Sequence, residues 1–320
     1  MADLFYQEKL MTKTASLYYQ KRLNQKQISE KLHISQPTVS RLLGKALKNN
    51  IVKVSVNNLP GSHSNLENEI CKKFNLKDCI ISKNSSKNNQ VLQNEIGNAA
   101  AFYLETILKN NETIGISSWS ETLLNTVNAM NNINNISNVR LVQTLGGIGH
   151  SSATEHAVHL LSRLTDLLNG EKYYLPISGI VSKNFDIHSL NDKFINNALK
   201  LLDQLSIALV GIGTIDNFSP LIKNSGNIFP KKEINRLIEK GAVGEMGLHY
   251  FDIKGNEINF SKNYKVIGLN FNQLKKTENA IAVAGGLHKV KAIIGALNTS
   301  FINTLITDPM TAKEIINYVK

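Results

Sequence analysis

The stretch KQISEKLHISQPTVSRLLGKA, residues 26–46, decides the fold of the first part of the chain. Its apolar residues Ile28 and Leu32 are four positions apart, which places them on one face of a helix. Residues 33–34 interrupt this pattern. The spacing therefore predicts a short helix over 25–32 followed by a tight turn.

A second helix is expected directly after the turn. Ser35 is a preferred N-cap residue, and Pro37 lies in the first helical turn, where its missing N–H costs nothing. This helix is predicted to end near Asn49. The side chains expected to face inward are Val39, Leu42, Leu43 and Ala46.

The flanking segments complete a helix-turn-helix unit. Residues 4–21 have helical apolar spacing and predict a first helix, and the alternating IVKVSV of 51–56 predicts a wing strand. Asn57–Ser62 is rich in turn-forming residues and is expected to be a linker. Residues 1–58 are therefore predicted to form an all-α, winged helix-turn-helix domain, with a second domain over 59–320.

The outward side of the unit carries groups that suit DNA. Glutamine can pair with adenine and arginine with guanine in the major groove, whereas Ser and Thr reach base edges or phosphates. Lys45, Gln25 and Lys26 are better placed for phosphates. The residues predicted to contact DNA are Gln25, Lys26, Gln36, Thr38, Ser40, Arg41 and Lys45.

The charge distribution supports this interpretation. The net charge is +11, and residues 1–58 hold ten Lys and Arg against three Asp and Glu. The remaining residues hold 26 basic and 22 acidic groups. A positive block of this kind is typical of a module that binds a polyanion. A basic solvated helix face, or a three-helix unit that contacts protein, is the alternative.

The composition excludes several classes of protein. A hydrophobic content of 42% and a charged content of 19% are typical of a folded globular chain. The two cysteines, Cys71 and Cys79, match neither a zinc site nor a disulfide framework. The sequence has no signal-peptide pattern and no long apolar run. We expect a cytoplasmic protein with no metal, cofactor or membrane partner.

The longer part of the chain predicts an α/β domain. Short apolar runs with strand character occur at 79–82, 113–117, 139–144, 206–213, 279–285 and 303–307. Amphipathic helical stretches lie between them at 90–109, 120–130, 153–169, 191–204, 231–240, 288–298 and 309–319. This alternation favours a doubly wound parallel sheet covered by helices on both faces.

Nearly every predicted strand ends in Gly, Ser or Thr just before a helix. In such sheets ligands bind outside the carboxyl ends of the strands, and glycine turns at helix starts form anion-binding nests. Lys289, just past a Gly-Gly pair, can supply positive charge. These turns predict a site for a phosphorylated or otherwise anionic small ligand. The candidate residues at the turns are Ser117, Trp119, Gly147, Gly149, Gly213, Asp216 and Lys289.

Seven segments in one order resemble SorC/DeoR-type sugar-binding bacterial transcriptional regulators. They are LNQKQISEKLHISQPTVSRLLGKALKNNIVKV, TIGISSWSETL, VQTLGGIG, IALVGIG, GAVGEMGLHYFDIKG, IAVAGGLHKVKAIIGAL and NTLITDPMTA. The resemblance implies a helix-turn-helix joined to an effector domain with a fold like that of sugar-phosphate isomerases and deaminases. It also implies a homo-oligomer, dimer or tetramer, on operator DNA, with binding modulated by a phosphorylated sugar.

The resemblance also suggests roles for single residues. Ser151 and Ser152 would bind phosphate at a helix start, with Gly147 and Gly149 shaping the loop. Lys289 would also bind phosphate, and Glu245 in GAVGE would accept sugar hydroxyl groups.

The chain departs from the family pattern in three places. Pro309 follows the TD pair where members often have an acidic residue, and Lys172 is the nearest candidate where others have a polar group near YYLP. Leu145 in the LGGIG loop leaves only Lys172 or Lys289 for an imine with an aldehyde sugar, so reversible noncovalent binding is favoured.

Two other functions stay open at the level of sequence. A sugar-phosphate isomerase or deaminase-like enzyme with an accessory DNA-binding domain would need a general base, and Asp216, Glu245, His150 and His288 follow strand ends. A recombinase or replication factor would need a nucleophile in a basic setting. We expect no enzyme activity, because a ligand-gated switch requires both parts of the chain and a catalytic domain does not.

Overall fold

The computed structural model describes residues 2–53, 61–117, 119–147, 151–215, 231–259 and 261–319. The chain divides into two compact units, Met1–Leu59 and Pro60–Lys320. The predicted linker lies largely outside the described residues, so the functional boundary at residue 58 stays a prediction.

The first unit consists of helices. They are α1 (Ala2–Ala15), which continues as the π-helical segment η1 (Ser16–Gln20), α2 (Gln25–Leu32) and α3 (Gln36–Lys48). These helices confirm the predicted ones. Local capping groups determine where α2 ends and α3 begins. Ser35 accepts the N–H of Thr38 at the start of α3, and His33 ends α2 in the left-handed conformation (φ 53°).

Two small apolar clusters hold these helices together. One contains Met11, Ala15 and Ala46, and the other contains Ile28, Val39 and Leu43. The inward side of α3 is therefore as predicted, with Leu42 partly buried. The predicted wing is not seen in residues 51–53, which form no strand, and its residues 54–56 lie outside the described part of the chain.

The second unit is built on a seven-stranded parallel sheet in the order β1-β13-β12-β6-β2-β3-β4. Its strands are β1 (Asp78–Ile81), β2 (Thr113–Ile116), β3 (Arg140–Gln143), β4 (Glu171–Tyr173), β6 (Ile207–Val210), β12 (Asn279–Val283) and β13 (Thr304–Thr307). All six predicted strands are confirmed. Strand β4 was missed because its sequence, EKY, is polar and its burial low, as befits an edge strand.

Helices cover both faces of this sheet, as the continuous apolar strands predict. Within β6, Ile207 and Leu209 face one layer and Ala208 and Val210 the other. The first layer contains α5 (Asn89–Ile107), α6 (Glu121–Ala129) and α7 (Ser151–Leu168). The second contains α4 (Ser64–Phe74), α8 (Lys193–Leu202), α11 (Phe271–Lys276), α12 (Val290–Asn298) and α13 (Pro309–Val319).

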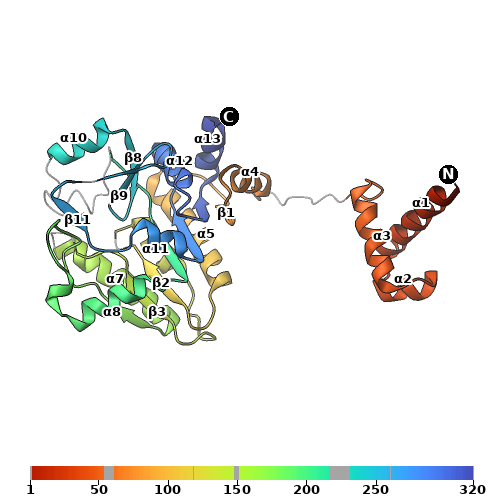
Figure 1. Cartoon of the computed structure of the whole chain (residues 1–320), viewed down its shortest axis with the longest axis horizontal. Helices are drawn as coiled ribbons and strands as arrows, with labels where there is room; N and C mark the ends of the chain where they lie inside the picture. The colour runs from red at the N-terminus through yellow and green to blue at the C-terminus, as the bar shows by residue number, and fades with distance from the viewer. Residues whose placement is uncertain are drawn as a thin grey trace. The chain divides into compact units, whose positions relative to one another are not determined.

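The two ends of this unit lie side by side. Figure 1 shows α4 next to the C-terminal helix α13. The apolar pattern of the sequence did not predict α4. The Lys73 ammonium donates a hydrogen bond to the backbone oxygen of Val319 over 3.0 Å. Helix α4 also packs on β1, so the start of the domain is fixed to the edge of the sheet.

Two small antiparallel sheets were not predicted, because strands such as AVGEM and HYFD contain no continuous apolar run. One has the order β10-β9-β8-β7, and the other pairs β11 with β5. The strands are β5 (Ile180–Ser182), β7 (Gly213–Thr214), β8 (Ala242–Met246), β9 (His249–Asp252), β10 (Glu257–Ile258) and β11 (Tyr264–Val266). The remaining elements are η2 (His188–Leu190), α10 (Lys231–Glu239) and η3 (Leu287–Lys289).

The order of the parallel sheet reverses at one place. From β2 the chain proceeds outward through β3 and β4, and from the adjacent β6 it proceeds in the opposite direction through β12 and β13. The loops after β2 and β6 therefore diverge and leave a crevice between them, which is where doubly wound sheets bind ligands. Among the described residues no helix is long and apolar enough to cross a membrane.

Candidate functional site

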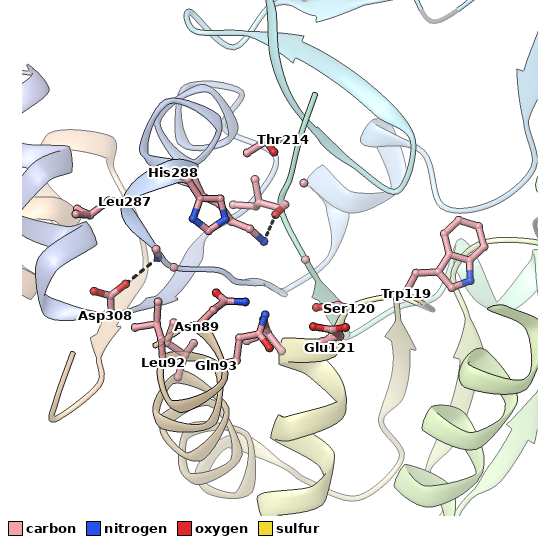
Figure 2. Close-up of a pocket in the computed structure, with 18 of the residues that line it drawn as sticks. Asn89, Leu92, Gln93, Trp119, Ser120, Glu121, Thr214, Leu287, His288 and Asp308 are labelled. Carbon is pink, nitrogen blue, oxygen red and sulfur yellow. Dashed lines mark hydrogen bonds between the residues drawn. The ribbon is translucent and has the colours of Figure 1, made fainter. Parts of the chain in front are cut away.

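A cavity of about 670 Å³ lies at the carboxyl ends of the parallel strands. Its walls come from the loops after β1, β2, β6, β12 and β13 and from the β7–β8 sheet. Figure 2 shows Asn89, Gln93 and Glu121 on one side of this cavity and Thr214 and His288 on the opposite side. The space is of a size usual for small-molecule ligands.

The loops after β2 and β6 approach each other closely at the crevice. Ser120 accepts the backbone N–H of Leu123 and so begins α6. A Cβ atom placed on Gly211 would lie 3.1 Å from the Ser120 hydroxyl oxygen. A larger residue after β6 would therefore crowd Ser120, and the start of α6 opens into the cavity.

Glu245 forms the wall on the side of the small sheet. It lies on β8 opposite Gly213, is only 8% exposed, and accepts the N–H of Leu248 over 2.8 Å. Its carboxylate occupies the space that a side chain at Gly213 would need. Burial raises the pKa of the Glu245 carboxyl, and the hydrogen bond from Leu248 and the charge of Lys289 oppose this shift.

A strained turn holds this carboxylate in place. Gly247 and Leu248 connect β8 to β9 as a two-residue hairpin turn with φ values of 59° and 66°. A leucine rarely adopts a positive φ, but here its N–H bonds to Glu245 and its side chain is buried. Backbone strain of this kind is typical of functional sites.

Lys289 projects its ammonium group into the cavity from η3. It donates to the backbone oxygen of Ile212 over 2.9 Å. Burial lowers the pKa of the Lys289 amine, and the charges of Glu245 and Glu121 act in the opposite direction. The lysine therefore lies within electrostatic reach of two carboxylates that come from separate elements, β8 and α6.

Asp308 joins three of the cavity loops. It is 1% exposed and accepts hydrogen bonds from the Ser85 hydroxyl over 2.8 Å and from the Gly286 N–H over 3.0 Å, as well as from the side chain and N–H of Thr311. Burial opposes its ionisation, but the bonds from Thr311, Ser85 and Gly286 outweigh this and lower the pKa of the Asp308 carboxyl. It thereby fixes the loops after β1 and β12 to the start of α13.

The floor of the cavity is the start of α5. Asn88 caps this helix, and Asn89, Leu92, Gln93 and Ile96 line the cavity. The side-chain oxygen of Gln93 is buried and has no hydrogen-bond partner among the described residues.

The structure brings together five of the residues that the sequence proposed for the ligand site. Ser117, Trp119, Gly213, Glu245 and Lys289 all line the cavity. Trp119 stands at its edge with the indole ring directed away from Asn89 and Gln93 (Figure 2) and packed against Leu145 and Ala157.

Two proposed residues lie elsewhere. Lys172 is an exposed residue of edge strand β4 whose ammonium lies 3.4 Å from the Ser162 hydroxyl, and it does not line the cavity. Gly147 is bonded through its backbone to Ile177 and Gly179 and is likewise not a lining residue. Lys172 was proposed from a loose similarity around YYLP, and the polar edge strand on which it lies was not predicted.

Four proposed residues lie wholly or partly outside the described part of the chain. Gly149 and Asp216, like the candidate base His150, lie outside the described residues. The backbone of Ser151 and Ser152 forms the first turn of α7, as expected, and their side chains lie outside the described part of the structure.

Sequence reasoning missed several lining residues. Ser85 and Ser86 follow β1 in the pattern seen after the other strands, so the same argument could have found them. Gln93 and Glu121 lie within helices, where nothing in the sequence separates a cavity residue from a solvated one. Among the described residues no group of three His, Cys, Asp or Glu side chains could hold a metal ion.

In the first unit the predicted DNA-contacting groups lie mostly in solvent. Gln36, Ser40, Arg41 and Lys45 of α3 are exposed, as is Lys26 of α2. Gln25 and Thr38 are half-buried, and the Thr38 hydroxyl lies 2.8 Å from that of Ser35.

Comparison with known proteins identifies the second unit. Residues 60–317 match the family described as "Putative sugar-binding domain". The chain belongs to this family. Among its relatives, the deoxyribonucleoside regulator of Bacillus subtilis (strain 168) is 29% identical over 312 residues, 97% of this chain and 98% of the relative. The sorbitol operon regulator of Klebsiella pneumoniae is 25% identical over 316 residues, 96% and 98% of the two chains.

Solved structures of the sugar-binding domain family share the fold. The crystal structure of the full-length sorbitol operon regulator SorC from Klebsiella pneumoniae covers 96% of this chain and 98% of its own, with a TM-score of 0.70 and 24% identity, a likeness that concerns the fold alone. A transcriptional regulator from Streptococcus pneumoniae TIGR4 covers 80% of this chain and 97% of its own, with a TM-score of 0.70 and 27% identity.

These findings confirm the resemblance seen in the sequence. The relatives span nearly the whole chain and are named as transcriptional regulators, not as enzymes. The prediction of a ligand-responsive transcriptional regulator with an N-terminal helix-turn-helix and a doubly wound α/β domain is confirmed at this level.

Proposed function

We propose that the protein regulates a carbohydrate-utilisation operon and that a phosphorylated sugar, bound in the cavity at the carboxyl ends of β2 and β6, modulates its affinity for operator DNA. The observation that carries this proposal is the cavity itself. A chain with a helix-turn-helix unit also holds a space of about 670 Å³ at the switch point of its sheet, with Lys289 and Glu245 facing into it.

The first unit, residues 1–58, is proposed to bind DNA. Gln36, Ser40 and Arg41 on the exposed side of α3 would contact base edges in the major groove. Lys45 and Thr38 of α3, and Gln25 and Lys26 at the start of α2, would contact phosphates and fix the register of the helix on the duplex. The local excess of positive charge would speed association.

The second unit, residues 59–320, is proposed to bind the effector. Lys289 lines the cavity on the side opposite the starts of α5 and α6, and its positive charge favours an anionic group there. Ser151 and Ser152 at the start of α7 remain proposed phosphate ligands. Lys289 would bind the anionic ligand and Glu245 its hydroxyl groups.

Oligomerisation would connect the two sites. A dimer or tetramer would place two α3 helices on operator half-sites about one helical turn apart, or a multiple of that. Effector binding would change the packing between second units and hence the spacing of the helices. The coupling is reciprocal, so operator DNA must weaken effector binding by the factor by which effector weakens operator binding.

The experiment is a fluorescence titration of the full chain. Trp119 is the only tryptophan and borders the cavity, so its emission reports on occupancy, with Trp119→Phe as the control for the signal. The ligands are five- and six-carbon sugar phosphates, including D-ribose 5-phosphate and D-glucitol 6-phosphate, with inorganic phosphate for comparison. DNA duplexes selected by the protein from a random library serve as operator.

We expect at least one sugar phosphate to change the Trp119 emission and the operator affinity without being turned over. Equal ligand affinity with and without operator would contradict the coupling. No response to any sugar phosphate would contradict the proposed ligand class, and formation of product would point to an enzyme instead.

A further inference from the structure

The close packing of α5 against α6 brings two polar side chains together on the cavity floor. A Cβ atom on Gly97 would lie 2.9 Å from the backbone carbon of Asn125, so the two helices touch at this point. Gln93 and Glu121 each lie four residues, about one turn, before these contact positions. Figure 2 shows them side by side at the starts of the two helices.

The available atoms of this pair are hydrogen-bond acceptors. The Gln93 side-chain oxygen is buried and without a partner among the described residues, and Leu92 and Ile96 on the same helix make its surroundings apolar. A buried acceptor without a donor is costly, and a ligand hydroxyl in the cavity would remove this cost by donating to it. An ionised Glu121 carboxylate also only accepts.

The acceptors determine which part of a ligand fits against the floor. A phosphate dianion has only acceptor oxygens and cannot donate to Gln93. A sugar hydroxyl can donate, and two neighbouring hydroxyls would serve the amide and the carboxylate together. The hydroxyl-bearing part of the ligand therefore belongs against α5 and α6, and the phosphate belongs elsewhere in the cavity.

We propose that Gln93 is a specificity-determining residue that accepts a hydrogen bond from one hydroxyl of the ligand, with Glu121 accepting from a neighbouring one. The inference rests on the proposed function and deepens it, because it states which residues distinguish one sugar phosphate from another. A site that requires a hydroxyl rejects an analogue lacking it, since its buried acceptor is then left unpaired.

The test uses Gln93→Met, which keeps the length of the side chain and removes the acceptor. Wild type and variant are titrated by Trp119 fluorescence with the sugar phosphate that gives the largest response and with its full series of monodeoxy analogues. We expect Gln93→Met to weaken the parent ligand about tenfold. One analogue in the series should bind both proteins equally, because it already lacks the hydroxyl that Gln93 contacts.

Two further variants distinguish the loss of the acceptor oxygen from a general disturbance of α5. Gln93→Glu keeps an acceptor oxygen and should still discriminate the parent from that one analogue. Asn98→Leu, on the exposed side of the same helix, should behave as wild type. Circular dichroism and operator binding without ligand report on the folding of each variant.

A competing explanation is internal to the protein. The Asn125 amide nitrogen is also buried without a partner among the described residues, and a rotated Gln93 could bond to it. In that case Gln93→Met would weaken the parent and every analogue by one common factor, or leave all unchanged, and either result would overturn the inference. Failure of wild type to bind any sugar phosphate would instead overturn the proposed function.

Discussion

The two units of this protein present their functional groups in opposite ways. In the first unit the predicted contacts with DNA lie mostly on one helix, α3, and are exposed. In the second unit the groups of the cavity come from five loops, spread from Ser85 to Met310, and several are buried. A reading helix requires only local structure, whereas a receptor cavity exists only when the whole sheet has formed.

The two units also differ in whether their polar side chains contact solvent or hydrogen-bond partners within the protein. Gln36, Arg41 and Lys45 are exposed to solvent. Glu245 and Asp308 are nearly out of solvent and are held by named hydrogen bonds. Changes in the first unit should therefore act on DNA affinity, and changes in the second should act on both ligand binding and stability.

The largest expected effect concerns Lys289. Lys289→Met removes the cation and leaves the carboxylates of Glu245 and Glu121 without its charge. We expect sugar-phosphate binding to weaken about 100-fold or more, a cost of about 3 kcal/mol, in a Trp119 titration. Operator binding without ligand should be unchanged. Lys172→Met, on exposed β4, is the matched control, and a normal response of Lys289→Met would show that the site is misplaced.

The second effect concerns the reading helix. Arg41→Ala should cost about 1–3 kcal/mol on the selected operator and less on random DNA, because a bidentate contact to a base is lost. Lys45→Ala, a phosphate contact in this proposal, should weaken both duplexes alike and reduce the salt dependence by about one unit. Fluorescence anisotropy of labelled duplexes at several salt concentrations measures both. Equal losses for Arg41→Ala on the two duplexes would argue against base recognition.

The third effect is on stability and its pH dependence. The pKa of Asp308 is lowered in the folded protein, so its ionised form stabilises the fold above the ordinary value of 3.8, and this contribution is lost as pH falls through the folded pKa. Asp308→Asn should lower the free energy of unfolding by about 1–3 kcal/mol at pH 7, with the difference shrinking below pH 4. Urea unfolding between pH 3 and 7 measures it. The exposed Asp166→Asn should show no such trend.

The smallest effects compare one glycine from each unit. A Cβ at Gly97 would press on the Asn125 backbone, so Gly97→Ala should destabilise the second unit by about 1–3 kcal/mol. A Cβ at Gly44 in α3 meets nothing within 4 Å, so Gly44→Ala should stabilise the first unit by about 0.5–1 kcal/mol. Trp119 fluorescence in urea follows the second unit and hydrogen exchange of α3 the first. If both substitutions changed the free energy of unfolding in the same direction, the expected difference between the two glycine positions would be contradicted.

The cavity was only partly predictable. Ser117, Gly213 and Lys289 were found because strands of a parallel sheet all end at one edge, and this rule needs no coordinates. Lys172, proposed from a loose similarity, does not line this cavity, and Gln93 was missed because its position beside Glu121 depends on how closely α5 approaches α6. Asp308 belongs to the TD pair that precedes Pro309, but its role was not predicted, because its bonds to Ser85 and Gly286 join residues more than twenty positions apart.

The amino-acid sequence by itself determined the helices of the first unit, six of the seven parallel strands and their alternation with helices, because apolar periodicity and capping act between neighbours in the chain. Only the tertiary structure decided that β7 and β8 would form a wall, that Glu245 would occupy the space beside Gly213, and that Gln93 would face Glu121. The strands of the small sheets contain no continuous apolar run. They and the contacts between distant loops are stabilised by packing, which exists only in the folded chain.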